Sequence, residues 1–154
     1  PVREIEKYHR NAVCYQDKEI SGNCQLEGIC GRVLDMTVEI VRGDFRQFTI
    51  SLARNERYHT DFTILKDSNM VEIDRTYSGM VHDTIAIRKA KMKTSTDKLQ
   101  LRFILDKYSV EIFLDDGQQV LSSTFYTPIE ADGIRFVCDG KAVVNIQKYD
   151  IVVD

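Results

Sequence analysis

One stretch of sequence decides the fold class: Val110-Glu111-Ile112-Phe113-Leu114-Asp115-Asp116-Gly117-Gln118. Its apolar residues at 110, 112 and 114 alternate with their neighbours, and a period of two residues is typical of a β-strand that buries one face. Asp116-Gly117 suits the centre of a type I′ turn, because both central residues of that turn need a positive φ. A return strand from Val120 to Tyr126 completes the pattern, so the stretch predicts an antiparallel β-hairpin.

Alternation of the same kind recurs along most of the chain, at intervals of about 8–14 residues with turn residues between the runs. Examples are Met36 to Ile40, Phe48 to Leu52 and Leu99 to Leu105. Asp132-Gly133 and Asp139-Gly140 predict two further turns, the second between strands at 134–138 and 142–146. Helical spacing of apolar residues is confined to a short candidate from Val2 to His9. The chain is therefore expected to be all-β, a two-sheet antiparallel β-sandwich.

Composition and charge narrow the function classes. The chain has 154 residues with 43% hydrophobic and 29% charged side chains, as expected of one soluble globular domain. Its net charge of −3 provides no basic field for a phosphate backbone, so nucleic acid is not an expected partner. No apolar run approaches the roughly 20 residues that cross a bilayer, so no membrane is expected either. The sequence starts at Pro1 without an apolar secretion segment, and we expect a segment of a longer protein.

The cysteines predict neither a metal site nor another cofactor. There are four of them, without a CxxC pair and without a histidine at the spacing of zinc ligands. They are Cys14, Cys24, Cys30 and Cys138. We expect mostly buried, reduced side chains, and a disulfide between Cys24 and Cys30, the nearest pair, is the alternative. Cysteines without a secretion segment favour a cytoplasmic location.

A longer run that contains the hairpin resembles a known family signature. The run from Asp106 to Gln118 reads D-K-Y-S-V-E-I-F-L-D-D-G-Q. It is similar to the D-R-S-S-V-E-V-F-V-N-D-G-E signature in the C-terminal domain of glycoside hydrolase family 32, which includes invertases, levanases, inulinases and sucrose-6-phosphate hydrolases. Its departures from that signature include Tyr108, Asp115 and Gln118. The resemblance implies a concanavalin-like jelly roll with about six strands in each sheet.

Shorter runs support the resemblance because they occur in the expected order and span nearly the whole chain. They are Pro1 to Ile5, Glu72 to Gly79, Leu99 to Leu105, Gly133-Ile134 and Val144 to Val153. The resemblance implies structural roles for a set of motif residues rather than chemical ones. This set is Asp106, Ser109, Val110, Glu111, Phe113, Asp116, Gly117, Asp74 and Arg75.

Several of these polar residues have simple structural interpretations. Asp106 is expected to cap the turn that leads into the hairpin. Asp74 and Arg75 could pair with each other. Glu111 is expected to bind within the sheet, since a catalytic acid would need a raised pKa and a partner carboxylate. Asp115-Asp116 lacks the spacing of a calcium loop, so a turn is the expected structure there.

Catalytic residues are not expected in this chain. In the family they lie in N-D-P-N-G, R-D-P and Glu-Cys motifs, but here no proline follows an Asp and no cysteine follows a Glu. Retaining glycoside hydrolysis needs two carboxyl groups about 5–5.5 Å apart. The scattered histidines His9, His59 and His82 do not indicate a Ser-His-Asp set. We therefore expect the isolated chain not to hydrolyse sucrose, sucrose 6-phosphate or inulin.

The resemblance also implies a partner. Residues 1–10 are expected to be a linker from a catalytic β-propeller of the same parent chain, and 11–154 the β-sandwich domain that stabilises it. An apolar patch is then expected around Val2, Ile5 and Tyr8, either exposed or covered in a homodimer. The alternative function is an autonomous carbohydrate-binding, lectin-like domain that stacks sugars on tyrosines, although the lack of Trp argues against it. The candidate sugar contacts are Tyr58, Tyr77, Tyr108 and Tyr126.

Overall fold

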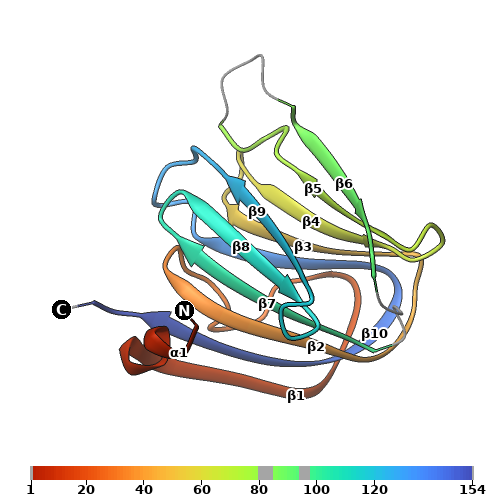
Figure 1. Ribbon diagram of the computed structural model, residues 1–154, viewed down its shortest axis with the longest axis horizontal. Helices are drawn as coiled ribbons and strands as arrows, with labels where there is room; N and C mark the ends of the chain where they lie inside the picture. Colours follow the sequence, from red (N-terminus) through yellow and green to blue (C-terminus); the bar gives the residue numbers. More distant parts are fainter. Residues whose placement is uncertain (1, 80–84, 94–97, 154) are drawn as a thin grey trace.

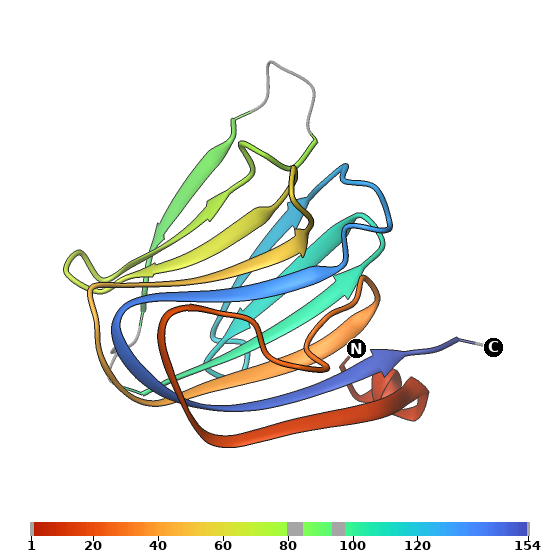
Figure 2. The same cartoon turned by 180° about the vertical axis from the view of Figure 1, so that it is seen from behind.

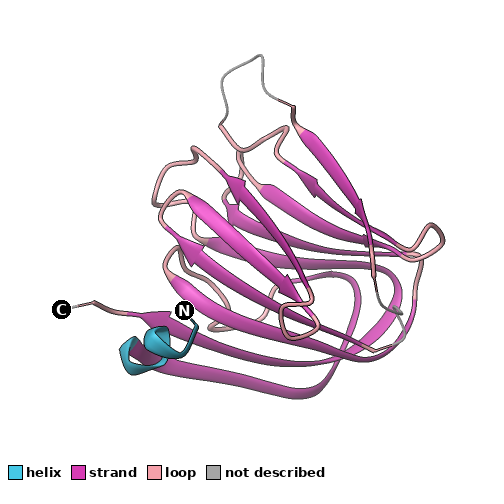
Figure 3. Cartoon of the chain, in the orientation of Figure 1, coloured by secondary structure: helices cyan, strands magenta, loops and turns pink. Residues whose placement is uncertain are grey.

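The computed structural model describes residues 2–79, 85–93 and 98–153, and nearly all regular structure in them is β-strand (Figure 3). The strands are β1 His9–Cys24, β2 Leu34–Asp44, β3 Gln47–Arg54, β4 Thr60–Leu65, β5 Met70–Asp74, β6 Ile87–Lys91, β7 Leu99–Asp106, β8 Ser109–Leu114, β9 Gln119–Thr124 and β10 Gly133–Ile151. A short helix α1 (Val2–Ile5) and a 3-10 turn η1 (Glu6–Tyr8) precede them, so the predicted N-terminal helix is confirmed up to Tyr8. Among the described residues, no helix is long and apolar enough to cross a membrane.

All ten strands belong to one antiparallel sheet that curls into two facing layers (Figure 1). One layer contains β3, β4, β5 and β6, and the other contains β2, β7, β8 and β9. The long strand β10 joins them, because its residues 133–138 pair with β3 and its residues 141–150 pair with β2. Strand β1 follows β10 through the same bend (Figure 2). Counting β1 and β10 in both layers, the described residues form six strands per layer, and the predicted β-sandwich is confirmed.

The core lies between the layers and follows from the alternation in the sequence. In β2 the side chains of Met36, Val38 and Ile40 are at most 1% exposed, while Glu39 points outward. Phe62 of β4 meets Phe103 of β7 edge to face, with 5.6 Å between ring centroids. Aromatic pairs in this geometry stabilise a core beyond their area of contact. The two layers therefore pack directly on each other.

The hairpin that predicted the fold joins β8 to β9. Asp116 and Gly117 have φ values of 57° and 84°, the sign that a type I′ turn requires, and Gln118 N donates to Asp115 O at 3.3 Å. Asp115 also fixes the turn to β7, since its backbone N donates to Gln100 O at 2.8 Å and its carboxylate accepts from Gln100 N at 3.1 Å. The inward residues of β8 at 110, 112 and 114 are each 1% exposed.

Replacing Gly117 with valine should lower the free energy of unfolding by about 1–2 kcal/mol, because a β-branched residue is strained at a φ of 84°. A new Cβ would only touch Phe113 Cδ1 at 3.9 Å, so the cost comes from the backbone rather than from a clash. Urea denaturation of both proteins measures it. An unchanged midpoint would contradict the turn geometry.

Neither of the other two predicted turns is present. Strand β10 runs without interruption through Asp139-Gly140 and merely bends there. Gly140 is needed because the backbone of β2 comes very close, and a Cβ at 140 would lie 2.0 Å from Asp44 O. The Asp139 carboxylate instead accepts from Arg46 N at 2.9 Å and so helps to hold the turn between β2 and β3. Gly133 starts β10, and the turn before it is closed by Ala131 N donating to Pro128 O.

The four cysteines are free thiols, so the alternative disulfide does not form. The expectation that most of them are buried was wrong. Cys138 alone is buried, at 1% exposed, and burial raises the pKa of its thiol. Cys24 is half-buried, and Cys14 and Cys30 are exposed because β1 and the loop after it lie at the surface.

Candidate docking surface

Loops from both layers meet at the end of the sandwich where the chain enters. They follow β1, β3, β5, β7 and β9, and backbone hydrogen bonds connect them. Gly31 N donates to Asp132 O at 2.8 Å, Phe125 N to Tyr108 O at 3.0 Å and Tyr126 N to Ser78 O at 2.8 Å. The N-terminal segment reaches the same end, since Val152 N after β10 donates to Tyr8 O at 3.0 Å. We call this region the loop end.

Large apolar side chains are exposed at the loop end. We call five of them the docking surface: Tyr77 (58% exposed), Ile85 (67%), Tyr108 (50%), Tyr126 (59%) and Ile129 (40%). Ile87, Val152 and Val153 are exposed at the same end. Elsewhere in the described residues, the exposed large apolar side chains are Val120 and Val137. Because a soluble monomer rarely gathers apolar side chains at its surface, this concentration indicates a surface that contacts something else.

The side chain of Arg32 holds together three loops of the loop end, and two of them carry residues of the docking surface. It is 5% exposed, and its guanidinium donates to the carbonyls of Lys107, Thr127, Pro128 and Ala131. It also lies 5.1 Å from the centre of the Phe125 ring and 5.7 Å from that of Tyr108. Burial lowers the pKa of Arg32, although an arginine stays charged at any physiological pH. The sequence pattern did not indicate Arg32, since a buried loop arginine leaves no periodic signal.

The motif from Asp74 to Gly79 connects the two layers at their open side. Asp74 and Arg75 do not bind each other, because the Asp74 carboxylate accepts from Thr76 N at 2.8 Å. Arg75, 7% exposed, donates to Thr124 Oγ1 at 3.1 Å and to Ile85 O at 3.1 Å. The buried Ser78 hydroxyl donates to Arg75 O at 2.7 Å. These bonds position Tyr77 and Ile85 beside Tyr126, so the motif builds the docking surface rather than an isolated ion pair.

The N-terminal segment is anchored to the outer face of the second layer through a buried carboxylate. Asp35, 3% exposed, accepts two hydrogen bonds from Arg102, at 2.9 and 2.5 Å, and lies 2.9 Å from His9 Nε2. The His9 ring stacks on Tyr149 with 4.1 Å between centroids. Ile5 and Tyr8 are half-buried, and the side chain of Val2 lies outside the described residues. The contacts of His9 with Asp35 and Tyr149 therefore hold the N-terminal segment in a fixed position on the domain.

The predicted motif residues have structural positions in the hairpin. Asp106 Oδ1 accepts from Lys107 N at 2.8 Å, which caps the tight turn before β8. Glu111 is exposed on the outer face, Ser109 and Phe113 are half-buried there, and Val110 faces the core. The predicted tyrosines all lie at the loop end. Tyr77, Tyr108 and Tyr126 belong to the docking surface, and the half-buried Tyr58 lies next to His59, whose ring is 5.1 Å from that of Tyr77.

A polar cluster on the outer face of the first layer contains serine, histidine and aspartate. Ser51 Oγ donates to Asp61 Oδ1 at 2.6 Å, and His59 Nδ1 lies 2.9 Å from the same oxygen. A nucleophilic serine would donate to the histidine instead, so this order of bonds is structural. The third histidine, His82, lies outside the described residues. Within the described ranges, no group of three or more His, Cys, Asp or Glu residues could hold a metal ion.

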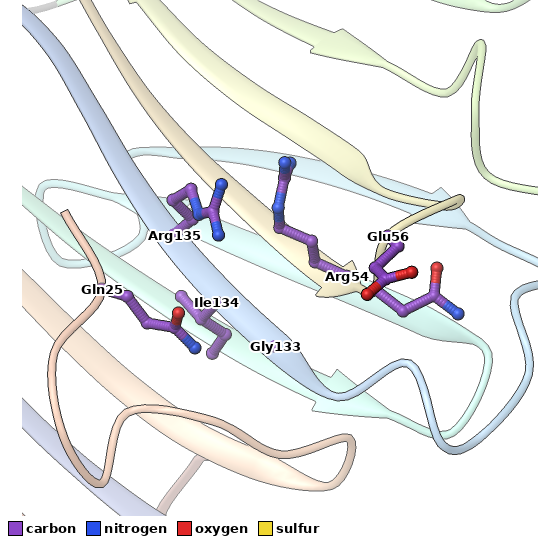
Figure 4. A pocket seen from close by; sticks show the side chains of 7 residues that line it. Gln25, Arg54, Glu56, Gly133, Ile134 and Arg135 are labelled. Carbon is purple, nitrogen blue, oxygen red and sulfur yellow. The ribbon is translucent and has the colours of Figure 1, made fainter. Parts of the chain in front are cut away.

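Next to this cluster is a hollow of about 460 Å³ (Figure 4). It is lined by Gln25, Arg54, Asn55, Glu56, Gly133, Ile134 and Arg135. The lining residues come from the end of β3 and the loop after it, the start of β10 and the loop after β1. The lining is polar and contains no aromatic ring, so it differs in character from the docking surface.

Comparisons with known proteins agree with this architecture. A family model described as "Glycosyl hydrolases family 32 C terminal" matches residues 4–152. Sucrose-6-phosphate hydrolase from Staphylococcus xylosus is 26% identical across 98% of this chain and 31% of that protein. The levanbiose-producing levanase of Bacillus subtilis is 22% identical across 91% of this chain and 28% of that protein. The chain thus spans less than a third of the length of these relatives.

Solved structures show the same fold. The structure of sucrose-6-phosphate hydrolase from Lactobacillus gasseri superposes with a TM-score of 0.79 at 18% identity, covering 99% of this chain and 30% of that one. Exo-inulinase from Aspergillus awamori gives a TM-score of 0.76 at 18% identity, covering 95% and 30%. With the family match over nearly the whole chain, the protein belongs to glycosyl hydrolase family 32, as the C-terminal β-sandwich domain of its fructosidases.

Proposed function

We propose that this chain is a non-catalytic module that packs on the catalytic domain of a β-fructosidase and stabilises it. The observation that carries the proposal is the docking surface, five exposed apolar side chains at the end where the chain enters. The relatives are more than three times as long as the segment that matches, so they contain further chain that such a surface could contact. Contacts between domains typically bury about 600–1,500 Å².

The construction of the loop end supports this role. Arg32 and Arg75 are buried, and both donate hydrogen bonds that hold loops in place rather than binding solvent or a carboxylate. A preorganised surface loses less conformational entropy when it binds. The tyrosines of the docking surface are also suited to contacts between domains, because they combine a large apolar ring with a hydroxyl at the rim.

Replacing Tyr126 with serine tests the proposal through a comparison of two proteins. In the isolated chain Tyr126 is 59% exposed, so the free energy of unfolding should change by less than about 0.5 kcal/mol. In the full-length fructosidase the same change should destabilise the protein by about 1–2 kcal/mol, because the ring would be buried between the domains. Thermal unfolding of both proteins and both variants gives the four values.

Val120 provides the matched control. It is 48% exposed but lies on β9, away from the docking surface, so Val120→Ser should have the same small effect in the isolated chain and in the full-length protein. Equal effects of Tyr126→Ser in the two proteins would show that the ring stays exposed in the full-length enzyme, which would overturn the proposed docking.

A further inference from the structure

A β-bulge brings two arginine side chains, Arg54 and Arg135, to the same hollow on the outer face of the first layer. Arg135 pairs with Ser51 and Gly133 with Arg54, so two residues of β3, Leu52 and Ala53, lie opposite one residue of β10. Both of them are buried, at 1% and 0% exposed, and Arg54 is thereby turned outward on the same face as Ser51. Arg54 Nη1 donates to Ser51 Oγ at 3.0 Å, and Ser51 is the residue of β3 that pairs with Arg135.

The bulge requires a strained backbone. Ala53 has a φ of 48°, a left-handed conformation that costs a non-glycine residue roughly 1–3 kcal/mol. Bulges often re-aim a side chain beside a functional site, and strain of this kind is concentrated at such sites. Here its consequence is that Arg54 lies on the outer face, where it lines the hollow together with Arg135, instead of facing the core (Figure 4).

The two arginines have no acidic partner in the part of the chain that the structure describes. No carboxylate of the described residues lies within 4.0 Å of either guanidinium, although Arg54 and Arg135 are both half-buried. Asp61, on the next strand, is already bound by Ser51 and His59. Two arginines that line one hollow without a bound carboxylate suit an anion, and the planar guanidinium fork matches the geometry of phosphate.

The hollow has room for more than an inorganic ion. Its volume of about 460 Å³ is within the range of roughly 300–1,000 Å³ for small-molecule sites. Gly133 contributes no side chain to the floor, and a Cβ there would lie 2.9 Å from Arg54 O. The Gln25 amide and the Glu56 carboxylate line other parts of the hollow (Figure 4). These groups can exchange hydrogen bonds with hydroxyls, whereas Glu56 would repel a second anion.

We propose that this hollow is a binding site for a sugar phosphate, in which Arg54 and Arg135 hold the phosphomonoester and Gln25 and Glu56 face the sugar hydroxyls. The site does not include the docking surface, so this inference stands independently of the proposed docking. The phosphate and the sugar contribute separately to the affinity. A ligand without the sugar measures the phosphate contribution, and a ligand without the phosphate measures the sugar contribution.

Isothermal titration calorimetry of the chain with fructose 6-phosphate, inorganic phosphate and fructose tests the site by measuring the affinity for each. Fructose 6-phosphate should bind about tenfold more tightly than inorganic phosphate, and fructose alone should not bind at millimolar concentration. Arg54→Gln and Arg135→Gln should each weaken the binding of fructose 6-phosphate about tenfold or more, since each removes one charged fork. Both side chains are half-buried at the surface, and circular dichroism checks that the variants fold.

Arg46→Gln is the matched control, because it removes the same charge from a side chain that is 82% exposed. Arg46 lies just before β3, at the opposite end of that strand from Arg54. It should leave the affinity unchanged. Equal affinities for inorganic phosphate and fructose 6-phosphate would overturn the sugar part of the proposal. No binding of either phosphate, or an equal loss of affinity in all three variants, would overturn the site itself.

Discussion

Replacing Arg32 with methionine should lower the free energy of unfolding by about 3 kcal/mol. The change would leave four carbonyl oxygens at the loop end without their donor. Each hydrogen bond to a charged group contributes about 1.5–3 kcal/mol. Part of that loss is offset, because the variant no longer has to bury a cation. Methionine keeps most of the volume beside Phe125, so loss of packing is a minor part. Urea denaturation with a two-state fit measures the difference.

Arg32→Lys separates charge from geometry in the same experiment. Lysine keeps the charge, but its three donors sit on one nitrogen. Unlike Arg32, it cannot reach the carbonyls of Lys107 and Ala131 simultaneously. We therefore expect a loss of stability for lysine as well, smaller than for methionine. If the methionine variant were as stable as the original chain, Arg32 would not hold the loops, and the account of a preorganised docking surface would fail with it.

Replacing Gly140 with alanine should destabilise the domain by a similar amount, about 3 kcal/mol. The new Cβ would lie 2.0 Å from Asp44 O and 3.1 Å from the Cα of Phe45, so β10 and β2 must move apart at the bend. Overpacking that displaces backbone typically costs about 1–3 kcal/mol, and a contact this short belongs at the upper end. The shift in urea midpoint measures it, and reduced protection of the β2 and β10 amides from hydrogen exchange would locate it.

Gly22→Ala is the control for this prediction. A Cβ at Gly22 would meet nothing within 4 Å, and the residue has a φ of 67°, so the cost there should be only the backbone strain of roughly 1 kcal/mol. A larger effect at Gly22 than at Gly140 would mean that backbone conformation, rather than the close approach of two strands, governs the glycines of this domain.

The sequence was informative where the physical cause is local. The alternation of apolar residues predicted the strands, and Asp116-Gly117 predicted a turn whose two central residues have a positive φ, because side-chain spacing and glycine freedom act within a few residues. The same signal failed at Asp139-Gly140. There a glycine is required because Asp44 O on a neighbouring strand leaves no room for a Cβ. Nothing within ten residues of Gly140 in the sequence indicates that contact.

By itself, then, the sequence determined the all-β class, the hairpin and the family. It determined these because each depends on short-range periodicity or on a continuous motif. Only the tertiary structure decided that one curled sheet forms both layers, that Arg32 and Arg75 hold the loop end, and that Tyr77, Tyr108 and Tyr126 share one surface. It also decided that a bulge at Ala53 brings Arg54 to the same hollow as Arg135. Each of these depends on which distant strands are neighbours, and a linear pattern does not encode that pairing residue by residue.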